Sequence, residues 1–287
     1  MGLVVMFNFY NGYNSMIRSY LKYFLLLCMI LFFRYPVALG AEKPIDLSTP
    51  QKSDNIALDK GGVVMTFDDR NFADWVKALP LFEEYGVKAT FFIHGEIDDK
   101  ALIAIQKIKE KNHAIGSHSV HHLKAVEYLQ KRSQKEYLEN EIQPQLDQFI
   151  ANGIDVSSFA YPMSRNNQAT DELLLKQFRH IRTGRNITKD KKFSEDDSFF
   201  VSVSEISKHG CLYGKGIDFA PTKPDRTFEQ IDAALERASE NKEILVLYAH
   251  QIANSAKGNH ITPEALMRIF GKAKELKLNF YTFDQLP

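Results

Sequence analysis

The sequence predicts a parallel α/β barrel, and three observations lead to this fold class. Short apolar runs alternate with amphipathic helical patterns from residue 62 to residue 283. Repeated alternation of this kind is typical of parallel strands joined by crossover helices. The runs are sufficient for about seven strands, which favours a barrel over an open sheet. No Gly-x-Gly-x-x-Gly pattern follows the first run, which argues against a dinucleotide-binding fold.

The individual elements follow from the periodicity of the apolar residues. Strands are predicted at 62–67, 89–93, 113–117, 157–161, 179–183, 199–203, 244–249 and 278–283. Helices are predicted at 71–85, 99–111, 132–151, 168–178, 227–240 and 262–276. Thr262-Pro263 is a typical helix start, because proline is tolerated in the first turn. Residues 184–226 fit the alternation poorly and predict either a solvated insertion or a loop over the barrel mouth that shapes substrate choice.

Composition limits the classes of partner. The chain has 287 residues, of which 44% are hydrophobic, enough for one full-sized domain with a large core. Its 36 basic and 36 acidic residues balance, so nothing indicates a surface for nucleic acid. No stable protein partner is predicted.

The N-terminal region predicts export. Arg18 and Lys22 precede an apolar run at 24–33, and small residues follow at Ala38 and Ala41. This is the layout of a signal peptide over residues 1–41, better formed if translation starts at Met16. The run is shorter than the ~20 residues of a membrane span, so an uncleaved anchor is the less favoured alternative. Residues 42–58 read as a polar linker, and 59–287 as the catalytic domain.

Two acidic residues and two histidines stand at the ends of separate apolar runs. Asp68 and Asp69 end the first strand, and His118 and His122 follow the third. The carboxyl ends of parallel strands gather at one face of a barrel, where ligands bind. Two imidazoles and one carboxylate form a set typical of a catalytic zinc or similar divalent site. The second carboxylate is then a candidate general base.

Each feature has a simpler interpretation when taken alone. Paired aspartates at a strand end often cap the following helix, here together with Asn71. Two histidines four residues apart occur often by chance. The combination at two strand ends favours the metal site.

These motifs resemble those of the polysaccharide deacetylase family. The match consists of Thr66-Phe67-Asp68-Asp69, Ala89-Thr90-Phe91-Phe92, His118-Ser119-x-x-His122 and a later Leu-Tyr-Ala-His ending at His250, over roughly residues 60 to 285. The resemblance implies an irregular, incompletely closed (β/α) barrel. It also implies that Asp68 is the catalytic base, that Asp69, His118 and His122 hold the metal, and that His250 is the general acid.

The chain departs from the family pattern at several positions. Many members have arginine where Ala160 stands, and Arg165 is a candidate replacement. Arg70 stands where glycine is usual, and it could narrow the site or bind an anionic substrate. The fourth motif, with aspartate and tryptophan, is not recognisable, since the only tryptophan is Trp75 in the first helix.

The third motif supplies the remaining candidates for substrate and oxyanion contacts. It resembles the Tyr-Pro subgroup of bacterial members at Tyr161-Pro162. Tyr161, Met163 and Tyr248 are predicted to form an apolar wall near the acetyl methyl group. The backbone N–H of Met163 could stabilise the oxyanion, because that role requires no particular side chain.

The predicted function is metal-dependent hydrolysis of N-acetyl groups from an amino-sugar-containing carbohydrate. The metal is predicted to be Zn²⁺, although Co²⁺, Ni²⁺ and Fe²⁺ suit the same ligands. Two alternatives stay open. One is an O-acetyl esterase or non-sugar amidase on the same barrel, and the other is an inactive carbohydrate-binding relative.

Overall fold

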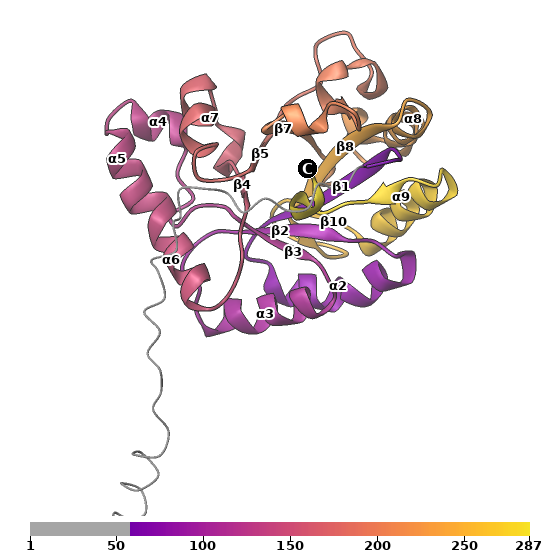
Figure 1. The fold of residues 1–287 in the computed structure, drawn as a ribbon. Coiled ribbons are helices and arrows are strands. Elements are labelled where there is room, and N and C mark those ends of the chain that lie inside the picture. The colour runs from indigo at the N-terminus through magenta and orange to yellow at the C-terminus, as the bar shows by residue number, and fades with distance from the viewer. Residues whose placement is uncertain (1–57) are drawn as a thin grey trace, which may run out of the picture. The chain divides into compact units, whose positions relative to one another are not determined.

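The structure is a computed structural model that describes residues 58–287, and these residues contain one α/β barrel (Figure 1). The predicted signal peptide and nearly all of the predicted linker lie outside the described residues. Seven parallel strands form the ring, in the order β1 (Gly62–Asp69), β2 (Ala89–Ile93), β3 (Ala114–Ser117), β4 (Ser158–Ala160), β5 (His180–Gly184), β7 (Cys211–Gly216) and β8 (Glu243–Ala249).

The predicted α/β barrel of about seven strands is confirmed, but the ring is closed and the predicted incomplete closure is wrong. Pairing of β8 with β1 completes the ring, from Gly62 opposite Ile244 to Phe67 opposite Ala249. The predicted irregularity is found between β3 and β4, where a single pair, Ser117 opposite Phe159, joins the strands.

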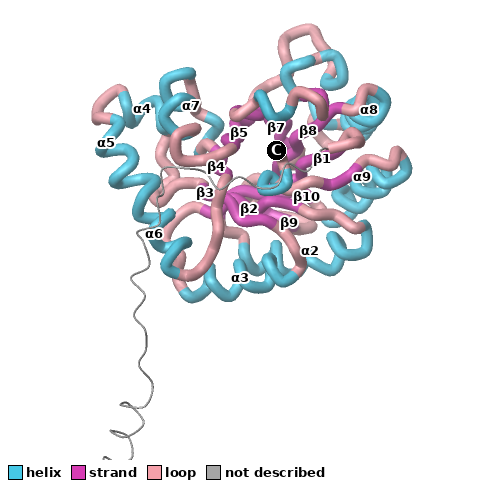
Figure 2. Tube along the Cα trace, in the orientation of Figure 1, coloured by secondary structure: helices cyan, strands magenta, loops and turns pink. Residues whose placement is uncertain are grey.

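Helices cover the outside of the ring, while the strands lie inside (Figure 2). The longer ones are α2 (Phe72–Tyr85), α3 (Asp99–Glu110), α6 (Gln143–Ala151), α7 (Gln168–Leu174), α8 (Phe228–Glu240) and α9 (Pro263–Glu275), with the short α4 (Ala125–Leu129) and α5 (Gln134–Tyr137). The side chain of Thr262 accepts a hydrogen bond from the backbone N–H of Ala265, so the predicted start of α9 is confirmed. Asn71 is the N-cap residue of α2 but makes no side-chain capping bond, and the simpler capping interpretation therefore loses its support.

Two layers of apolar side chains enclose the strands. In β1, Val63, Met65 and Phe67 belong to the core between strands and helices, whereas Val64 belongs to the core inside the barrel. Successive side chains of a strand point to opposite faces, so Asp68 follows Val64 toward the interior. The sequence thus places one buried aspartate inside the barrel at the end of an apolar strand.

The predicted insertion at 184–226 is wrong in one respect, because it contains the barrel strand β7. Gly214 and Gly216 make this strand look like a loop, yet both face the ring of Tyr248. A Cβ atom at Gly216 would lie 2.9 Å from Cζ of Tyr248, so the close approach requires glycine. The predicted strands at 199–203 and 278–283 form as β6 (Phe200–Ser202) and β11 (Asn279–Phe280), but outside the ring.

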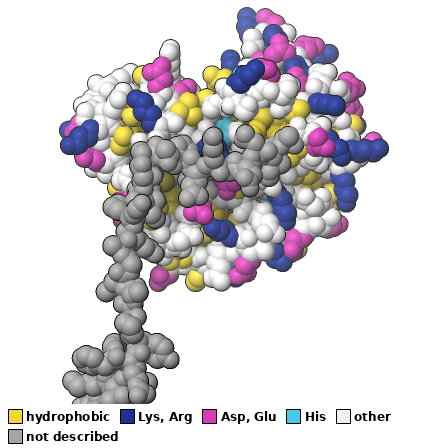
Figure 3. Space-filling model, in the orientation of Figure 1, with side chains coloured by type: hydrophobic (Ala, Val, Ile, Leu, Met, Phe, Trp, Pro, Cys, Tyr) yellow, Lys and Arg dark blue, Asp and Glu magenta, His cyan; other side chains and the backbone are white. Residues whose placement is uncertain are grey.

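Charged side chains of both signs are spread over the face seen in Figure 3, in keeping with the balanced composition. Within residues 58–287, no helix combines the length and apolarity needed to cross a membrane.

Candidate active site

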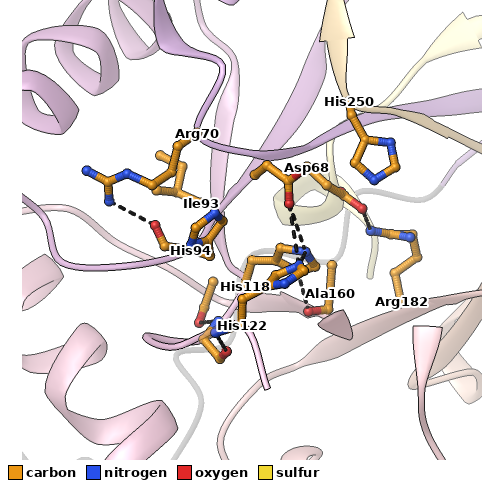
Figure 4. A network of polar contacts seen from close by, with 12 residues as sticks. Asp68, Arg70, Ile93, His94, His118, His122, Ala160, Arg182 and His250 are labelled. Carbon is orange, nitrogen blue, oxygen red and sulfur yellow. Dashed lines mark hydrogen bonds and ion pairs between the residues drawn. The ribbon is translucent and has the colours of Figure 1, made fainter. Parts of the chain in front are cut away.

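The functional candidates meet at one end of the barrel because they follow the carboxyl ends of neighbouring strands. Asp68 and Asp69 end β1, His118 and His122 follow β3, and His250 follows β8. In Figure 4, His118 and His122 lie on one side of Asp68, and His250 and Arg182 lie on the other.

Asp69, His118 and His122 form a set suited to a divalent metal, since their ligand atoms lie within 4.8 Å of one another. The two Nε2 atoms are 3.2 Å apart. Oδ1 of Asp69 lies 3.8 Å from Nε2 of His118 and 3.4 Å from Nε2 of His122. Ligands about 2.05 Å from a tetrahedral zinc are about 3.4 Å apart, so the observed distances fit such an ion.

The protonation of His118 also fits a metal ligand. Its Nδ1 lies 2.7 Å from the carbonyl oxygen of Ala160 and donates its hydrogen there, which leaves the lone pair of Nε2 facing the site. Burial lowers the pKa of His118 to about 3, so the ring is neutral. Burial raises the pKa of Asp69. A bound cation would oppose that shift by favouring the carboxylate form.

Asp68 forms a buried ion pair with Arg182 of β5. Burial alone would raise the pKa of Asp68, but the positive charge of Arg182, together with that of His250, holds it below its usual value. Oδ2 accepts the bond from Arg182, whereas Oδ1 has no partner among the described residues. Asp68 therefore carries an ionised carboxylate with one free oxygen.

Arg182, and not the candidate Arg165, places a guanidinium beside Asp68. Arg165 lies at the surface, with its Nε 3.2 Å from Oε1 of Glu127. Ala160 on β4 is the register partner of Arg182 on β5. Paired residues of neighbouring strands point to the same face. Arg182 therefore lies one strand away from position 160, where many members of the resembled family have arginine. It lies at the same level of the barrel as Ala160, whose side chain is small.

Aromatic rings hold the guanidinium of Arg182 in place. It lies 4.5 Å from the ring centroid of Tyr248 and 5.5 Å from that of Phe92. The ring of Tyr248 fits between strands only because Gly184 and Gly216 lack side chains: a Cβ atom at Gly184 would lie 2.5 Å from the tyrosine hydroxyl oxygen. Tyr248 thus packs on the arginine inside the barrel.

His250 is held from two sides. Its backbone N–H donates to Oδ1 of Asp218 at 3.0 Å, and its Nδ1 lies 2.7 Å from Oδ2 of the same residue. On the other side, the indole N–H of Trp75 donates to the carbonyl oxygen of His250 at 2.8 Å. Asp218, which follows β7, and Trp75 of α2 thus hold His250 from opposite sides.

The surroundings of His250 favour its protonated form. Burial by itself lowers its pKa, but the hydrogen bond with Asp218 and the charges of Asp68 and Asp218 raise the pKa to about 9. The imidazole is therefore protonated at neutral pH, with Nε2–H as the proton not held by Asp218.

Other predicted contacts lie elsewhere. Arg70 donates to the carbonyl oxygens of His94 and Glu96 and pairs with Asp98. The loop after β2 thus holds its guanidinium, and this arrangement does not favour the predicted binding of an anionic substrate. In Figure 4 it points away from Asp68. His94 lies beside the site, with its ring centroid 5.0 Å from that of His122.

The apolar surface predicted for Tyr161, Met163 and Tyr248 is only partly present. Tyr161 alternates with Ala160 and so faces outward, where its hydroxyl donates to Asp171 at 2.8 Å and its ring packs under α7. It does not line the barrel mouth. Pro162 is buried, while Met163 is 58% exposed and has a positive φ of 53°. A left-handed conformation at a non-glycine residue is common at functional sites.

Two signals could have revealed the missed residues. Arg182 is a charged residue inside an otherwise strand-like run, which requires a buried partner. Asp218 directly follows Gly216-Ile217, a strand end that the glycine-rich composition conceals.

A family model matches part of this chain. Residues 55–178 match the family model described as polysaccharide deacetylase. A search among curated proteins found no match.

Several solved structures are similar in fold. The Xyl-CE4 domain of a multidomain xylanase from the hindgut metagenome of Trinervitermes trinervoides is 19% identical, with a TM-score of 0.51 over 79% of this chain and 89% of that one. A T48 deacetylase with substrate gives the same identity and TM-score over 79% and 90%. A CE4 family pseudoenzyme from Bacillus anthracis is 17% identical, with a TM-score of 0.51 over 80% and 66%.

Proposed function

We propose that this chain, whose residues 55–178 match the polysaccharide deacetylase family model, removes N-acetyl groups from an amino-sugar-containing poly- or oligosaccharide. The observation that carries the proposal is a base and an acid on opposite sides of one site, each in the required protonation state. Surrounding charges keep Asp68 ionised and His250 protonated at neutral pH. Groups whose pKa values are pushed apart in this way are typical of acid–base catalysis.

In the proposed reaction, the two residues move protons at separate atoms. Oδ1 of Asp68, which Arg182 leaves free, accepts a proton from the attacking water. Nε2 of His250 donates a proton to the leaving amine nitrogen, which is a poor leaving group without it. Asp218 and Trp75 keep the imidazole at its place during the transfer.

The metal proposed for Asp69, His118 and His122 is Zn²⁺, for which the spacing and the neutral imidazoles are suited. When bound, such an ion supplies Lewis acidity to the water and to the acetyl carbonyl. The exposed turn at Met163 supplies the proposed backbone N–H for the oxyanion, and Tyr248 keeps the guanidinium of Arg182 beside Asp68.

The structure reduces the support for an inactive carbohydrate-binding relative. That alternative rested on the absence of the motif arginine, on Arg70 and on the unrecognised fourth motif. In this proposal Arg182 of β5 and Asp218, which follows β7, fill those roles, and Arg70 is engaged with its own loop. A chain that keeps these pairs intact is better explained as an enzyme.

The proposal is tested by acetate release from N-acetylglucosamine oligomers, peptidoglycan fragments and acetylated xylan. The wild-type protein is compared with Asp68→Asn, and the metal content of both is measured. We expect release from the amino-sugar substrates that falls by at least 10³-fold in the variant while about one metal ion is retained. Release from xylan alone would identify an O-acetyl esterase, and metal binding without any release would favour the inactive relative.

We also propose that the protein is exported, with cleavage near Ala41 as the sequence predicts. Mass spectrometry of protein secreted or released from its native host would test this. A mature N-terminus close to residue 42 supports export, and an intact N-terminus in the cytoplasm contradicts it.

A further inference from the structure

The loop that carries the two histidine ligands has a strained backbone. Ser119 and His122 have φ values of 62° and 56°, both in the left-handed region. Each such residue costs about 1 kcal/mol or more unless its surroundings enforce the conformation. Other groups must therefore hold residues 118–122 in place.

Glu141 contacts this loop through three atoms. Its Oε2 accepts the backbone N–H of His121 at 3.0 Å, and its Oε1 lies 2.6 Å from Nδ1 of the same residue. Its backbone carbonyl accepts the N–H of Val120 at 3.0 Å. The Glu141 side chain is almost entirely buried, whereas that of His121 is 62% exposed, so the bond fixes the backbone next to His122 from the inside.

Gln145 holds the other end of the loop. Its Oε1 accepts the hydroxyl of Ser117 at 2.7 Å. Its Nε2 contacts the carbonyl oxygens of Ile93 at 2.9 Å, Gly95 at 2.8 Å and Ser119 at 3.2 Å. One fully buried amide thus ties the loop after β3 to the end of β2.

The helix that presents these two residues is itself unusual. The sequence predicts one helix at 132–151, but the structure interrupts it with a π-helical turn, η1 (Leu138–Ile142), between α5 and α6. Glu141 lies in this turn, on the buried face that also carries Tyr137 and Phe149. A buried carboxylate on an otherwise apolar face is costly unless it is hydrogen-bonded, and π turns often occur at functional sites.

We propose that Glu141, together with Gln145, is a positioning residue for the metal ligands His118 and His122. In the hydrogen bonds described for residues 58–287, Glu141 bonds to His121 and Val120 and not to the ligand side chains, so it acts by fixing the backbone of the loop between them. The inference rests on metal binding by the proposed function, but not on the identity of the substrate.

The test measures metal binding directly. Zn²⁺ affinity is determined by competition with a chromophoric chelator for the wild type, for Glu141→Gln and for the matched control Glu139→Gln. Glu139 lies in the same π turn, and its side chain is exposed. Its Oε1 lies 3.7 Å from Nζ of Lys135. We expect Glu141→Gln to weaken Zn²⁺ binding about 10- to 100-fold, as is typical when a residue supporting metal ligands is changed. The control should bind as the wild type does.

One further readout and a second variant separate positioning from general destabilisation. The Co²⁺ absorption spectrum reports ligand geometry, and we expect it to change in Glu141→Gln but not in Glu139→Gln. If Glu141→Gln does not fold, Glu141→Asp retains the charge and withdraws it by one methylene, so it serves for the same measurements. Unchanged Zn²⁺ affinity and an unchanged Co²⁺ spectrum would overturn the inference, whereas a wild type that binds no divalent metal would overturn the proposed function instead.

Discussion

Removing Arg182 should both destabilise the protein and alter the chemistry of Asp68. Arg182 is fully buried, and its guanidinium pairs with a carboxylate that is itself 3% exposed. In Arg182→Ala that carboxylate stays buried without its partner. Breaking a buried ion pair from one side costs about 3–5 kcal/mol of unfolding free energy, and we expect a loss in this range near pH 8.

The loss should depend on pH in a defined direction. In the wild type, the pKa of Asp68 is depressed, so the pair stabilises the fold above the unfolded-state pKa of Asp68 and loses this effect as pH falls through the folded-state pKa. Without Arg182, burial raises the pKa of Asp68. The carboxyl then takes up a proton at higher pH, and the difference in unfolding free energy between variant and wild type should shrink as pH is lowered from 8 to 5.

Urea denaturation at the two pH values measures this difference. Arg165→Ala is the control, because it removes only a surface pair worth about 0–1 kcal/mol. The register between Ala160 and Arg182 provides a rescue, since the double variant Ala160→Arg/Arg182→Ala places an arginine at the same level of the barrel. A loss for Arg182→Ala below about 1 kcal/mol, or an equal loss at both pH values, would refute the account of the ion pair.

Three further changes test other parts of the site. Asp218→Asn should lower the pKa of His250 from about 9. Because the acid works only while protonated, the alkaline limb of the kcat/KM pH profile should move to lower pH. An alkaline limb at the same pH as in the wild type would argue against the acid role. Trp75→Phe removes the hydrogen bond to the carbonyl oxygen of His250. It should lower kcat by about tenfold, a rise of roughly 1.4 kcal/mol in the activation free energy, and leave the metal content unchanged. Loss of the metal would contradict the assignment of Trp75 to the support of His250. Gly216→Ala should lower the unfolding free energy by about 1–3 kcal/mol, measured by thermal unfolding, because the added methyl group overpacks against Tyr248. Gly258→Ala is the control, because the space around Gly258 is open. Equal stability of the two variants would refute the close approach of Gly216 to Tyr248.

The sequence by itself determined the features that depend on local pattern. Alternation of apolar runs and helical patterns predicts the barrel, because burying each face requires a fixed period of 2 or 3.6 residues. Asp68, Asp69, His118 and His122 follow from the same logic, since they are polar residues placed where buried strands end.

Only the tertiary structure decided which residues from distant segments meet. Arg182 lies 114 residues from Asp68 in the chain, and Trp75 lies 175 residues from His250. No local pattern links such pairs, because the register between neighbouring strands and the packing of α2 against the segment that follows β8 bring them together. The strand β7 was hidden for the same reason: Gly214 and Gly216 are needed for the ring of Tyr248 on the next strand, a requirement that exists only once the barrel has closed.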